Sequence, residues 1–449
     1  MPAFKLVNVR GDLFATISSF GLQTVIRLGS SLILTRILLP EAYGVITIMM
    51  SIAFVLEMLS DINVSVFIIR DKNAEQARYL NTAWTMRLAR ASMNSLLLFL
   101  LAPVIAVSLY HVPVLVTPLR VFSIFFVVGG LESMSFPLAI RHKRARIVMY
   151  SELIASAIGT SFSVVYCYYS RDYWGIIFGI LLSRTLLSAF SYGFYKDFRP
   201  RVQFDRSVAR EIFKFARFNT PSSLLTLAMS QFDKVVFLRL FDLTALGVYG
   251  LASNISGAIE SLISKVSQSV LYPRCAHNFR ANPDTLGQKY YTENVRLLAG
   301  ILFLPAVIGG AAHLIIAILY PSRYAAAGAI LQAFMLRATL LAIGSPSEDL
   351  LIATGEYQVI LHGNVFRALW MFAASLTGYY LFGFMGFVYG AALSALPPLI
   401  YYFWLQAKHG MLTVKYECYR AAFALGIWVS AYLTSHVLLT SFPGMHLHR

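Results

Sequence analysis

Polar side chains recur at spacings of three and four along an otherwise apolar stretch, residues 12–38. On a helix they form one stripe, which includes Asp12, Thr16, Ser19, Gln23 and Arg27. An arginine in the middle of such a segment costs about 2.5 to 3.5 kcal/mol on membrane-insertion scales, so the stripe must face protein or water. We therefore expect this helix to line a polar cavity in which Gln23 and Arg27 bind an anionic substrate group. Alternatively, Arg27 pairs with an internal carboxylate such as Glu57 or Glu260.

Four carboxylates in apolar segments suit a site for a coupling ion such as a proton or Na⁺: Glu57, Asp61, Glu132 and Glu260. The first two lie four residues apart, on one face of a helix over 42–69. The third follows Gly129-Gly130, which predicts a bend or a close helix contact, and helix bends are where transporters place ion ligands. The alternatives are helix-end positions near the outer interface for the first two, and a structural ion pair with Lys265 for the fourth.

Two further pairs of charged residues are candidates for binding the substrate. Arg87 and Arg90 lie three residues apart at the start of a helix over 81–110, and their alternative role is contact with the inner lipid headgroups. Asp233 and Lys234 are adjacent, so on a helix they point about 100° apart and need not pair with each other. Their alternative role is an ion pair between two parts of the molecule.

Other charged residues inside apolar segments have no assigned chemistry. Three arginines, Arg184, Arg337 and Arg367, have no partner evident in the sequence. The pair Glu348-Asp349 follows Pro346 near the expected inner end of a helix, so we expect it to be solvated.

The whole chain has the composition of a polytopic membrane protein. Of its 449 residues, 58% are hydrophobic and 13% are charged, and the mean hydropathy is +0.66. Apolar runs of about 20 residues, enough to cross about 30 Å of hydrocarbon, recur from residue 12 to residue 440. Such runs joined by short loops favour an all-α helical bundle over a β-barrel. The three Cys residues lie far apart with no paired spacing, so neither a disulfide framework nor a metal site or other cofactor is expected.

About thirteen transmembrane helices are predicted, within a range of twelve to fourteen. Their ranges are 12–38, 42–69, 81–110, 114–140, 147–170, 174–195, 213–240, 244–272, 293–320, 324–353, 357–382, 385–406 and 419–440. With the N-terminus in the cytoplasm, the inner loops carry twenty-three Lys and Arg, whereas the outer loops and the C-terminus carry six. That imbalance predicts this orientation. It also explains the net charge of +16 without a nucleic-acid partner, because the cations are spread between the apolar runs.

An internal repeat divides the chain. At an offset of 203 residues, 16–62 aligns without gaps with 219–265, and nine of the forty-seven pairs are identical, including Glu57/Glu260. We predict two six-helix lobes over 1–200 and 201–407, related by pseudo-two-fold symmetry about the membrane normal, and an additional transmembrane helix over 408–449. Their polar stripes would face each other across a central pathway. The alternative is that the stripes pack together through small residues.

Short motifs in both halves carry a family resemblance. They are the run from Arg27 to Gly44, Leu59-Ser-Asp61-Ile-Asn63, Asn81-Thr-Ala-Trp84-Thr-Met-Arg87, and Phe232-Asp233-Lys234 leading to Leu246-Gly247-Val-Tyr249. In these motifs the chain resembles the bacterial polysaccharide biosynthesis flippases, the O-antigen and exopolysaccharide translocases of the multidrug/oligosaccharidyl-lipid/polysaccharide exporter superfamily. It departs from the family in two ways. Members often have twelve or fourteen helices, and their Asp-x-Gly after the second helix reads Asp61-Ile-Asn63 here.

The resemblance implies a two-lobed transporter of the bacterial inner membrane rather than an enzyme. Such a transporter moves undecaprenyl-pyrophosphate-linked oligosaccharides from the cytoplasmic to the periplasmic leaflet by alternating access, for assembly of lipopolysaccharide or exopolysaccharide. Coupling to a H⁺ or Na⁺ gradient is implied as well. Related lipid flippases line the cavity with arginines, and Arg27 is similar in placement. The implied partners are the lipid-linked oligosaccharide, membrane lipids and other polysaccharide assembly proteins.

Three other functions fit parts of the sequence. A multidrug or other lipid-linked precursor exporter of the same superfamily would favour internal carboxylates, whereas this chain has both signs of charge. A membrane polymerase, ligase or acyltransferase would need a sizeable outer loop or a catalytic His/Asp pair, and His111 and His313 have no evident acidic partner nearby. A passive scaffold would not need repeated polar stripes.

Overall fold

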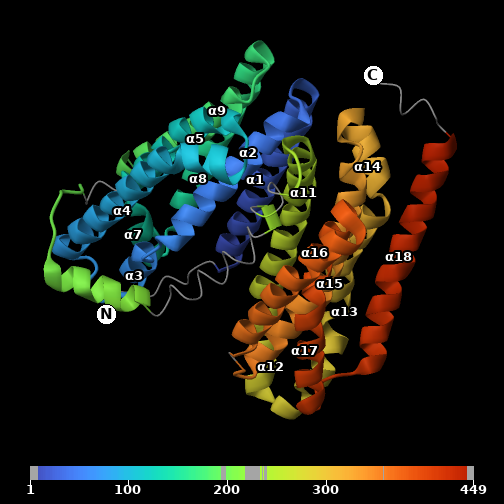
Figure 1. Cartoon of the computed structure of the whole chain (residues 1–449). Helices are drawn as coiled ribbons and strands as arrows, with labels where there is room; N and C mark the ends of the chain where they lie inside the picture. The colour runs from blue at the N-terminus through green and yellow to red at the C-terminus, as the bar shows by residue number, and fades with distance from the viewer. Residues whose placement is uncertain are drawn as a thin grey trace. The chain divides into compact units, whose positions relative to one another are not determined.

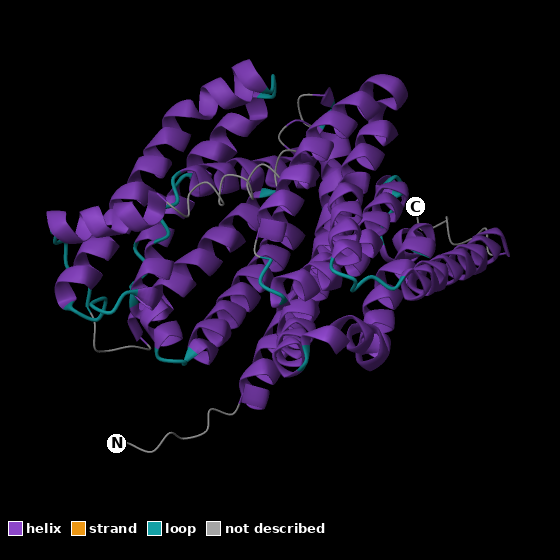
Figure 2. Ribbon diagram, turned by 90° about the horizontal axis from the view of Figure 1, so that it is seen from below, coloured by secondary structure: helices purple, strands orange, loops and turns teal. Residues whose placement is uncertain are grey.

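The computed structural model describes residues 9–193, 199–217, 233–234, 236, 240–356 and 358–441, with the side chains of the first helix from Gly21 onward. Within these ranges every regular element is a helix and no strand occurs (Figure 2), so the predicted all-α class is confirmed. The chain divides into two units, Met1–Leu227 and Ala228–Arg449. Each unit is described by itself.

The N-terminal unit is a bundle of long helices with short interruptions (Figure 1). Its helices are α1 (Val9–Ile37), α2 (Pro40–Leu59), α3 (Val64–Arg70), α4 (Ala77–Pro103), α5 (Val116–Phe122), α6 (Ile124–Gly130), α7 (Ser135–Arg141), α8 (Ala145–Ser170), α9 (Trp174–Gly193) and a short helix over 206–217. A π-helical turn over Val104–Leu109 extends α4, and a 3-10 turn over Pro113–Leu115 precedes α5. Within the bundle α1 packs on α8, α8 on α9, and α4 on α6.

The C-terminal unit is organised around one buried helix, α15. Its helices are α11 (Leu243–Val266), α12 (Tyr272–Ala281), α13 (Leu286–Gly310), α14 (Ala312–Leu319), α15 (Ala327–Ala353), α16 (Gln358–Ala392), α17 (Leu396–Lys408) and α18 (Val414–Ser441). Most side chains of α15 are buried, because α11, α13, α16 and α17 all pack against it. The helix α16 is kinked at Gly383, which divides it into two parts. Gly383 has a φ of +62°, which glycine adopts without strain.

Nine segments within the described ranges are long and apolar enough to cross a membrane. This number is consistent with the predicted polytopic bundle. The predicted helix over 213–240 lies mostly outside the described residues, so the count of thirteen stays a prediction. The predicted lobe boundary at residue 200 lies somewhat before the division between the two units at residue 227.

The helix predicted over 42–69 is interrupted after Leu59. Asn63 has a φ of +51°, and its backbone N–H donates a hydrogen bond to Oδ1 of Asp61 at 3.0 Å. The chain therefore turns before α3 begins. Asparagine tolerates this left-handed conformation better than most residues, which explains how it replaces the glycine of the family pattern. Because Asp61 lies beyond the end of α2, the prediction that Glu57 and Asp61 share one helix face is wrong.

The helix predicted over 114–140 is also divided, with its main interruption at residues 131–134. Irregular backbone at membrane depth needs hydrogen-bond partners within the protein, and neighbouring helices supply them. The carbonyl of Leu131 accepts hydrogen bonds from Trp84 Nε1 at 3.4 Å and from the Tyr192 hydroxyl at 2.5 Å. The backbone N–H of Ser133 donates to Ser191 Oγ at 2.8 Å. The bend predicted after Gly129-Gly130 is therefore confirmed.

The internal repeat is visible where its second helix begins. The helix α2 starts at Pro40 and α11 starts at Leu243, an offset of 203 residues. The two starts are capped differently, because Asp242 accepts a hydrogen bond from the N–H of Ala245 at 2.7 Å, whereas Leu39 offers no side-chain cap. The first helix of the second copy lies mostly outside the described residues, so the repeated polar stripe stays a prediction.

The close contact between α4 and α6 depends on the missing side chain of Gly130. A Cβ atom at this position would lie 2.5 Å from Cβ of Ala91 and 3.3 Å from Cα of Leu88, so α4 itself would have to shift. We expect Gly130→Ala to lower the free energy of unfolding by about 1 to 3 kcal/mol, the usual cost of overpacking. Unfolding in detergent measures this loss. Gly300→Ala in α13 is the control, because no atom lies within 4 Å of its Cβ position, and equal losses in both variants would contradict the prediction.

Candidate functional site

A cluster of charged side chains joins the helices of the N-terminal unit. Arg87 of α4 donates to Glu132, with Nη2 and Oε1 2.9 Å apart. Arg184 of α9 approaches the other oxygen of the same carboxylate, with Nη1 and Oε2 3.7 Å apart. Arg90 lies one turn after Arg87 on the same face of α4 and contacts Oδ1 of Asp61 at 3.4 Å. Predicted substrate-binding and ion-coupling residues are thus paired with one another here.

The interruptions in the helices place these carboxylates where the arginines reach them. Glu132 lies in the break at 131–134, and Asp61 lies in the turn between α2 and α3. Gly129, just before the first of these breaks, leaves room for Arg184, because a Cβ atom there would lie 2.5 Å from its Nη2 atom. The local backbone therefore fixes the geometry of the cluster.

Glu57 completes the cluster beside a small cavity. The cavity has a volume of 20 Å³, which suffices for about one water molecule and excludes a substrate headgroup. Its lining includes Glu57, Asn94 and the side chains of Arg87, Arg90 and Arg184. The cluster combines three guanidinium groups with the carboxylates of residues 57, 61 and 132, so its formal charges cancel.

A second charge network lies in the C-terminal unit. Glu260 of α11 accepts a hydrogen bond from Nε of Arg337 of α15 at 3.0 Å, and Nη2 of the same arginine lies 2.9 Å from Oε1 in an ion pair. The same Oε1 atom accepts from Ser256 Oγ at 2.7 Å. The guanidinium carbon of Arg337 lies 4.7 Å from the ring centre of Phe334, a cation–π contact. This network holds α11 against α15.

Asp233 is buried close to that network. Its Oδ2 atom accepts a hydrogen bond from the Tyr249 hydroxyl at 2.6 Å, and its Oδ1 atom accepts from the backbone N–H of Lys234 at 2.9 Å. The ring of Tyr249 meets Phe334 edge-on at 5.1 Å, which places this carboxylate near Arg337. The Lys234 side chain is half-buried and makes no ion pair with any described residue.

Arg27 differs from the arginines of the cluster in having no partner among the residues that the structure describes. It is exposed on α1, and its guanidinium makes neither a hydrogen bond nor an ion pair with the described residues, so the pairing with Glu57 considered above is not formed. Gln23 lies one turn earlier on the same helix face and is half-buried. The hydroxyl of Ser30 donates to the backbone carbonyl of Arg27 at 2.9 Å, so it does not occupy the guanidinium.

The carboxylates predicted to bind an ion have different partners. Asp61, Glu132 and Glu260 each contact an arginine, whereas the Glu57 carboxylate makes no ion pair within the described part of the chain. No group of three His, Cys, Asp or Glu side chains among the described residues is arranged to hold a metal ion. Among the described residues, the site therefore consists of ion pairs and of Glu57, whose carboxylate forms no direct ion pair but lies beside the cavity that Arg87, Arg90 and Arg184 line.

Sequence analysis missed several pairings that the structure shows. Arg184 and Arg337 find their carboxylates on distant segments, and no local spacing signals such contacts. Asp349, expected to be solvated, is 6% exposed and accepts a hydrogen bond from Ser267. Arg420 is buried in α18 and donates to both carboxylate oxygens of Glu417 at 2.8 and 2.9 Å. The i, i+3 spacing of that last pair is a signal that could have found it.

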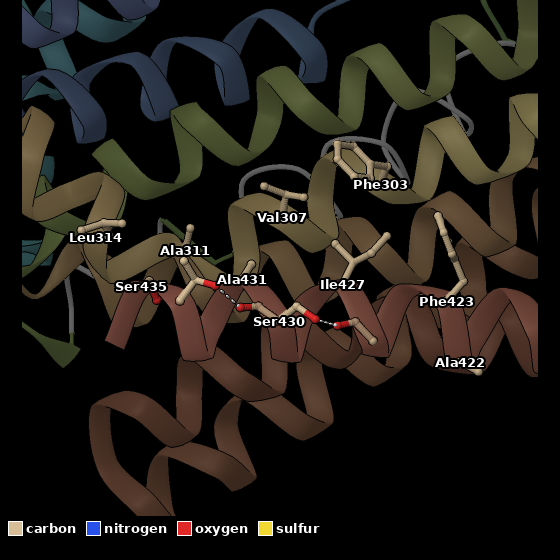
Figure 3. A pocket seen from close by; sticks show the side chains of 12 residues that line it. Phe303, Val307, Ala311, Leu314, Ala422, Phe423, Ile427, Ser430, Ala431 and Ser435 are labelled. Atoms are coloured by element: carbon tan, nitrogen blue, oxygen red, sulfur yellow. Dashed lines mark hydrogen bonds between the residues drawn. The ribbon is translucent and has the colours of Figure 1, made fainter. Parts of the chain in front are cut away.

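An apolar groove runs along α13 and α18 of the C-terminal unit (Figure 3). Its volume is 630 Å³, and large side chains such as Phe303 and Phe423 line it. The hydroxyls of Ser430 and Thr434 donate to backbone carbonyls one turn earlier in α18, at 2.8 Å each. Because these donors are already used, the groove suits a hydrocarbon chain rather than a charged or sugar group.

The ion pairs of Glu132 should be energetically coupled. Glu132→Gln leaves Arg87 and Arg184 without their carboxylate, and we expect a loss of about 3 to 5 kcal/mol in the free energy of unfolding, typical of a broken buried pair. Arg87→Gln should also destabilise. The double variant should lose less than the sum, with a coupling of about 0.5 to 3 kcal/mol.

Unfolding of the four proteins of this cycle in detergent measures the coupling. Glu75→Gln is the control, because its side chain is 55% exposed and its contact with Arg141 should contribute less than about 1 kcal/mol. Strict additivity of the two single losses would show that the 2.9 Å contact contributes nothing specific.

The chain matches the family model for polysaccharide biosynthesis proteins over residues 33–329. It is 23% identical over 434 residues to the lipopolysaccharide biosynthesis protein WzxC of Escherichia coli K12, an alignment that covers 94% of this chain and 85% of the relative. It is 21% identical over 308 residues to the teichuronic acid biosynthesis protein TuaB of Bacillus subtilis 168, covering 67% and 63%. With the succinoglycan biosynthesis transport protein ExoT of Rhizobium meliloti 1021, identity is 21% over 266 residues, covering 59% and 52%.

Two solved structures share the fold. The lipid II flippase MurJ in an inward closed conformation has a TM-score of 0.71 at 13% identity, covering 95% of this chain and 92% of MurJ. An inward-facing multidrug resistance transporter of the MATE family, in the MOP superfamily, has a TM-score of 0.67 at 15% identity, covering 92% and 98%. At such low identities the likeness shows a common architecture, which agrees with the predicted transporter-like bundle.

Proposed function

Because the chain belongs to the polysaccharide biosynthesis protein family, we propose that it moves a lipid-linked oligosaccharide across a membrane during assembly of a surface polysaccharide. Its likeness to a succinoglycan transport protein and the fold shared with a lipid II flippase support this proposal. The observation that carries it is Arg27, an arginine on the long helix α1 whose guanidinium has no partner among the described residues. Such a group needs water or an anionic ligand.

A pyrophosphate is the ligand that fits Arg27 best. Guanidinium binds phosphate oxygens through two parallel hydrogen bonds, which an ammonium group cannot do. We therefore propose undecaprenyl-pyrophosphate-linked oligosaccharide as the substrate, with Arg27 on the pyrophosphate and Gln23 beside it as a neutral hydrogen-bonding group. Lys234 and Asp233, which belong to the second copy of the repeat, are proposed as further substrate-binding residues.

Arg87 and Arg90 have a different place in the proposal. Their charges are balanced by Glu132 and Asp61, so a headgroup would have to compete with a carboxylate for each of them. We propose that they act mainly by holding the interrupted helices in position. In this proposal they contact the substrate only during a transient step of transport. Their ion pairs distinguish Arg87 and Arg90 from Arg27, whose guanidinium has no partner among the described residues.

Glu57 is the carboxylate that we propose for ion coupling. Asp61, Glu132 and Glu260 each form an ion pair with an arginine. Glu57 forms no direct ion pair with a described residue and lies beside the small cavity, so a proton or Na⁺ could bind there without breaking such a pair. The proposal places the protein in the bacterial inner membrane with its N-terminus in the cytoplasm, working by alternating access without enzyme chemistry.

Substitution of Arg27 tests the proposed function directly. We expect Arg27→Ala to abolish flipping while the protein remains inserted and folded, because the substrate loses its proposed anionic contact. Arg27→Lys is the matched variant, and it should retain partial activity because it keeps the charge but loses the paired hydrogen bonds. Lipid extraction measures the accumulated lipid-linked glycan in cells that carry each variant. Normal surface glycan with Arg27→Ala would refute the role of Arg27.

Glu57→Gln tests the proposed coupling. The neutral amide cannot change its charge, so transport in proteoliposomes should lose its dependence on an imposed H⁺ or Na⁺ gradient. Glu41→Gln is the matched control at the other end of α2, and it should leave that dependence unchanged. An unchanged gradient dependence with Glu57→Gln would assign coupling to another group.

A further inference from the structure

The short helix over 206–217 is fixed to the N-terminal unit by one face. Val208 and Ile212 are fully buried, and with Ala209 they belong to a hydrophobic cluster formed with side chains of α3, α4 and α7. Figure 1 shows this helix, in green, lying across the ends of those three helices. Asp205 precedes it, and hydrogen bonds from the backbone N–H groups of Val208 and Ser207 lower the pKa of its carboxyl, so it remains an ionised helix cap.

The extended segment before this helix is also anchored. Backbone N–H groups of residues 201, 203 and 205 donate to Asn81, Thr85 and Thr82, each at 3.1 Å. These acceptors lie in the first turns of α4, where its membrane-spanning segment begins. The segment over 201–217 is therefore a built part of the unit, placed at the boundary of the membrane.

The outward face of the helix is basic. At 100° per residue, Arg206, Arg210, Phe213, Lys214 and Arg217 fall within a sector of about 100°, and all five are exposed. No carboxylate lies in this sector, and none of its four cations forms an ion pair with a described residue. The acidic residue of the helix, Glu211, lies outside the sector and accepts a hydrogen bond from Tyr79 at 3.0 Å.

Apolar side chains accompany these cations. Phe213 is 56% exposed within the basic sector, and Val202 and Phe204 of the preceding segment are 78% and 57% exposed. Cations beside exposed aromatic groups at the end of a membrane span match the two parts of a lipid surface, the headgroup phosphates and the upper acyl chains. A soluble anion such as inorganic phosphate would use the cations but not the apolar groups.

We propose that this basic face, residues 206, 210, 213, 214 and 217, binds the anionic phospholipids of the inner leaflet. The proposal rests on the cytoplasmic orientation proposed above. Because the segment lies shortly before the division between the two units at residue 227, lipid binding would fix the start of their connection at the membrane surface.

A fluorophore beside the face tests lipid binding. The full chain with Ser207→Cys and Cys418→Ser is labelled with an environment-sensitive dye and reconstituted in nanodiscs of phosphatidylcholine with increasing phosphatidylglycerol. We expect a blue shift that grows with phosphatidylglycerol and is reversed by high salt. The same shift without phosphatidylglycerol, or no shift at all, would overturn the proposal. A shift produced by inorganic phosphate in phosphatidylcholine discs would also overturn it, because the anion would then be soluble phosphate.

Two quadruple variants separate the basic face from net charge. The test variant carries Arg206→Gln, Arg210→Gln, Lys214→Gln and Arg217→Gln. The control carries Arg280→Gln, Arg296→Gln, Lys408→Gln and Lys415→Gln in the C-terminal unit. The apparent affinity for phosphatidylglycerol should fall by about tenfold or more in the test variant only, and equal losses in both would refute a specific face.

Two further measurements keep the outcomes separate. If the test variant does not fold, the protein with the unsubstituted face provides the test. High salt should reverse its phosphatidylglycerol-dependent blue shift, and a shift that salt leaves unchanged would refute binding through the basic face. Arg27→Ala should keep the lipid-dependent shift while it loses flipping, so failure of the proposed function is distinguishable from failure of lipid binding.

Discussion

An ionised side chain inside a membrane must meet an opposite charge, water or a ligand, and this requirement organises both units. In the N-terminal unit Glu132 meets Arg87 and Arg184, which come from two different helices. In the C-terminal unit Glu260 meets Arg337. Each carboxylate therefore fixes the positions of helices that apolar contacts alone would allow to slide. Lipid tails are as apolar as the side chains, so the hydrophobic effect gives no preference for one helix contact over contact with lipid.

The interruptions of the helices meet the same requirement for polar partners inside the protein. A broken helix exposes backbone carbonyls and N–H groups, and these need partners as much as a charge does. At residues 131–134 the partners are Trp84, Tyr192 and Ser191, from helices on either side. The break at the turn before α3 instead uses its own side chain, Asp61, which also contacts Arg90. Polar backbone and charged side chains are thus gathered at the same points, where each helps to satisfy the other.

The sequence predicts the parts of this structure that depend on local composition. Segments of about 20 apolar residues are visible because the bilayer sets their length, and the bend near Glu132 is visible because two glycines precede it. The turn at Asn63 was not visible, because hydropathy does not report a positive φ. The partners of Arg184 and Arg337 were not visible either, since contacts between distant helices depend on packing that no local spacing encodes. Burial of Asp349 was missed for the same reason.

The two copies of the repeat start their second helices at equivalent residues, but the equivalent carboxylates in these helices have different contacts. Glu57 and Glu260 occupy equivalent positions 203 residues apart, in helices that start at equivalent residues. Glu260 is held by Arg337 and Ser256, and its charge is therefore part of the structure. Glu57 forms no ion pair with a described residue, so a change in its charge would not break a fixed ion pair of that kind. An ion-coupled transporter needs such a change at only one carboxylate. Duplication of the fold therefore leaves one copy of this carboxylate in a fixed ion pair and the other without a direct ion pair to a described residue.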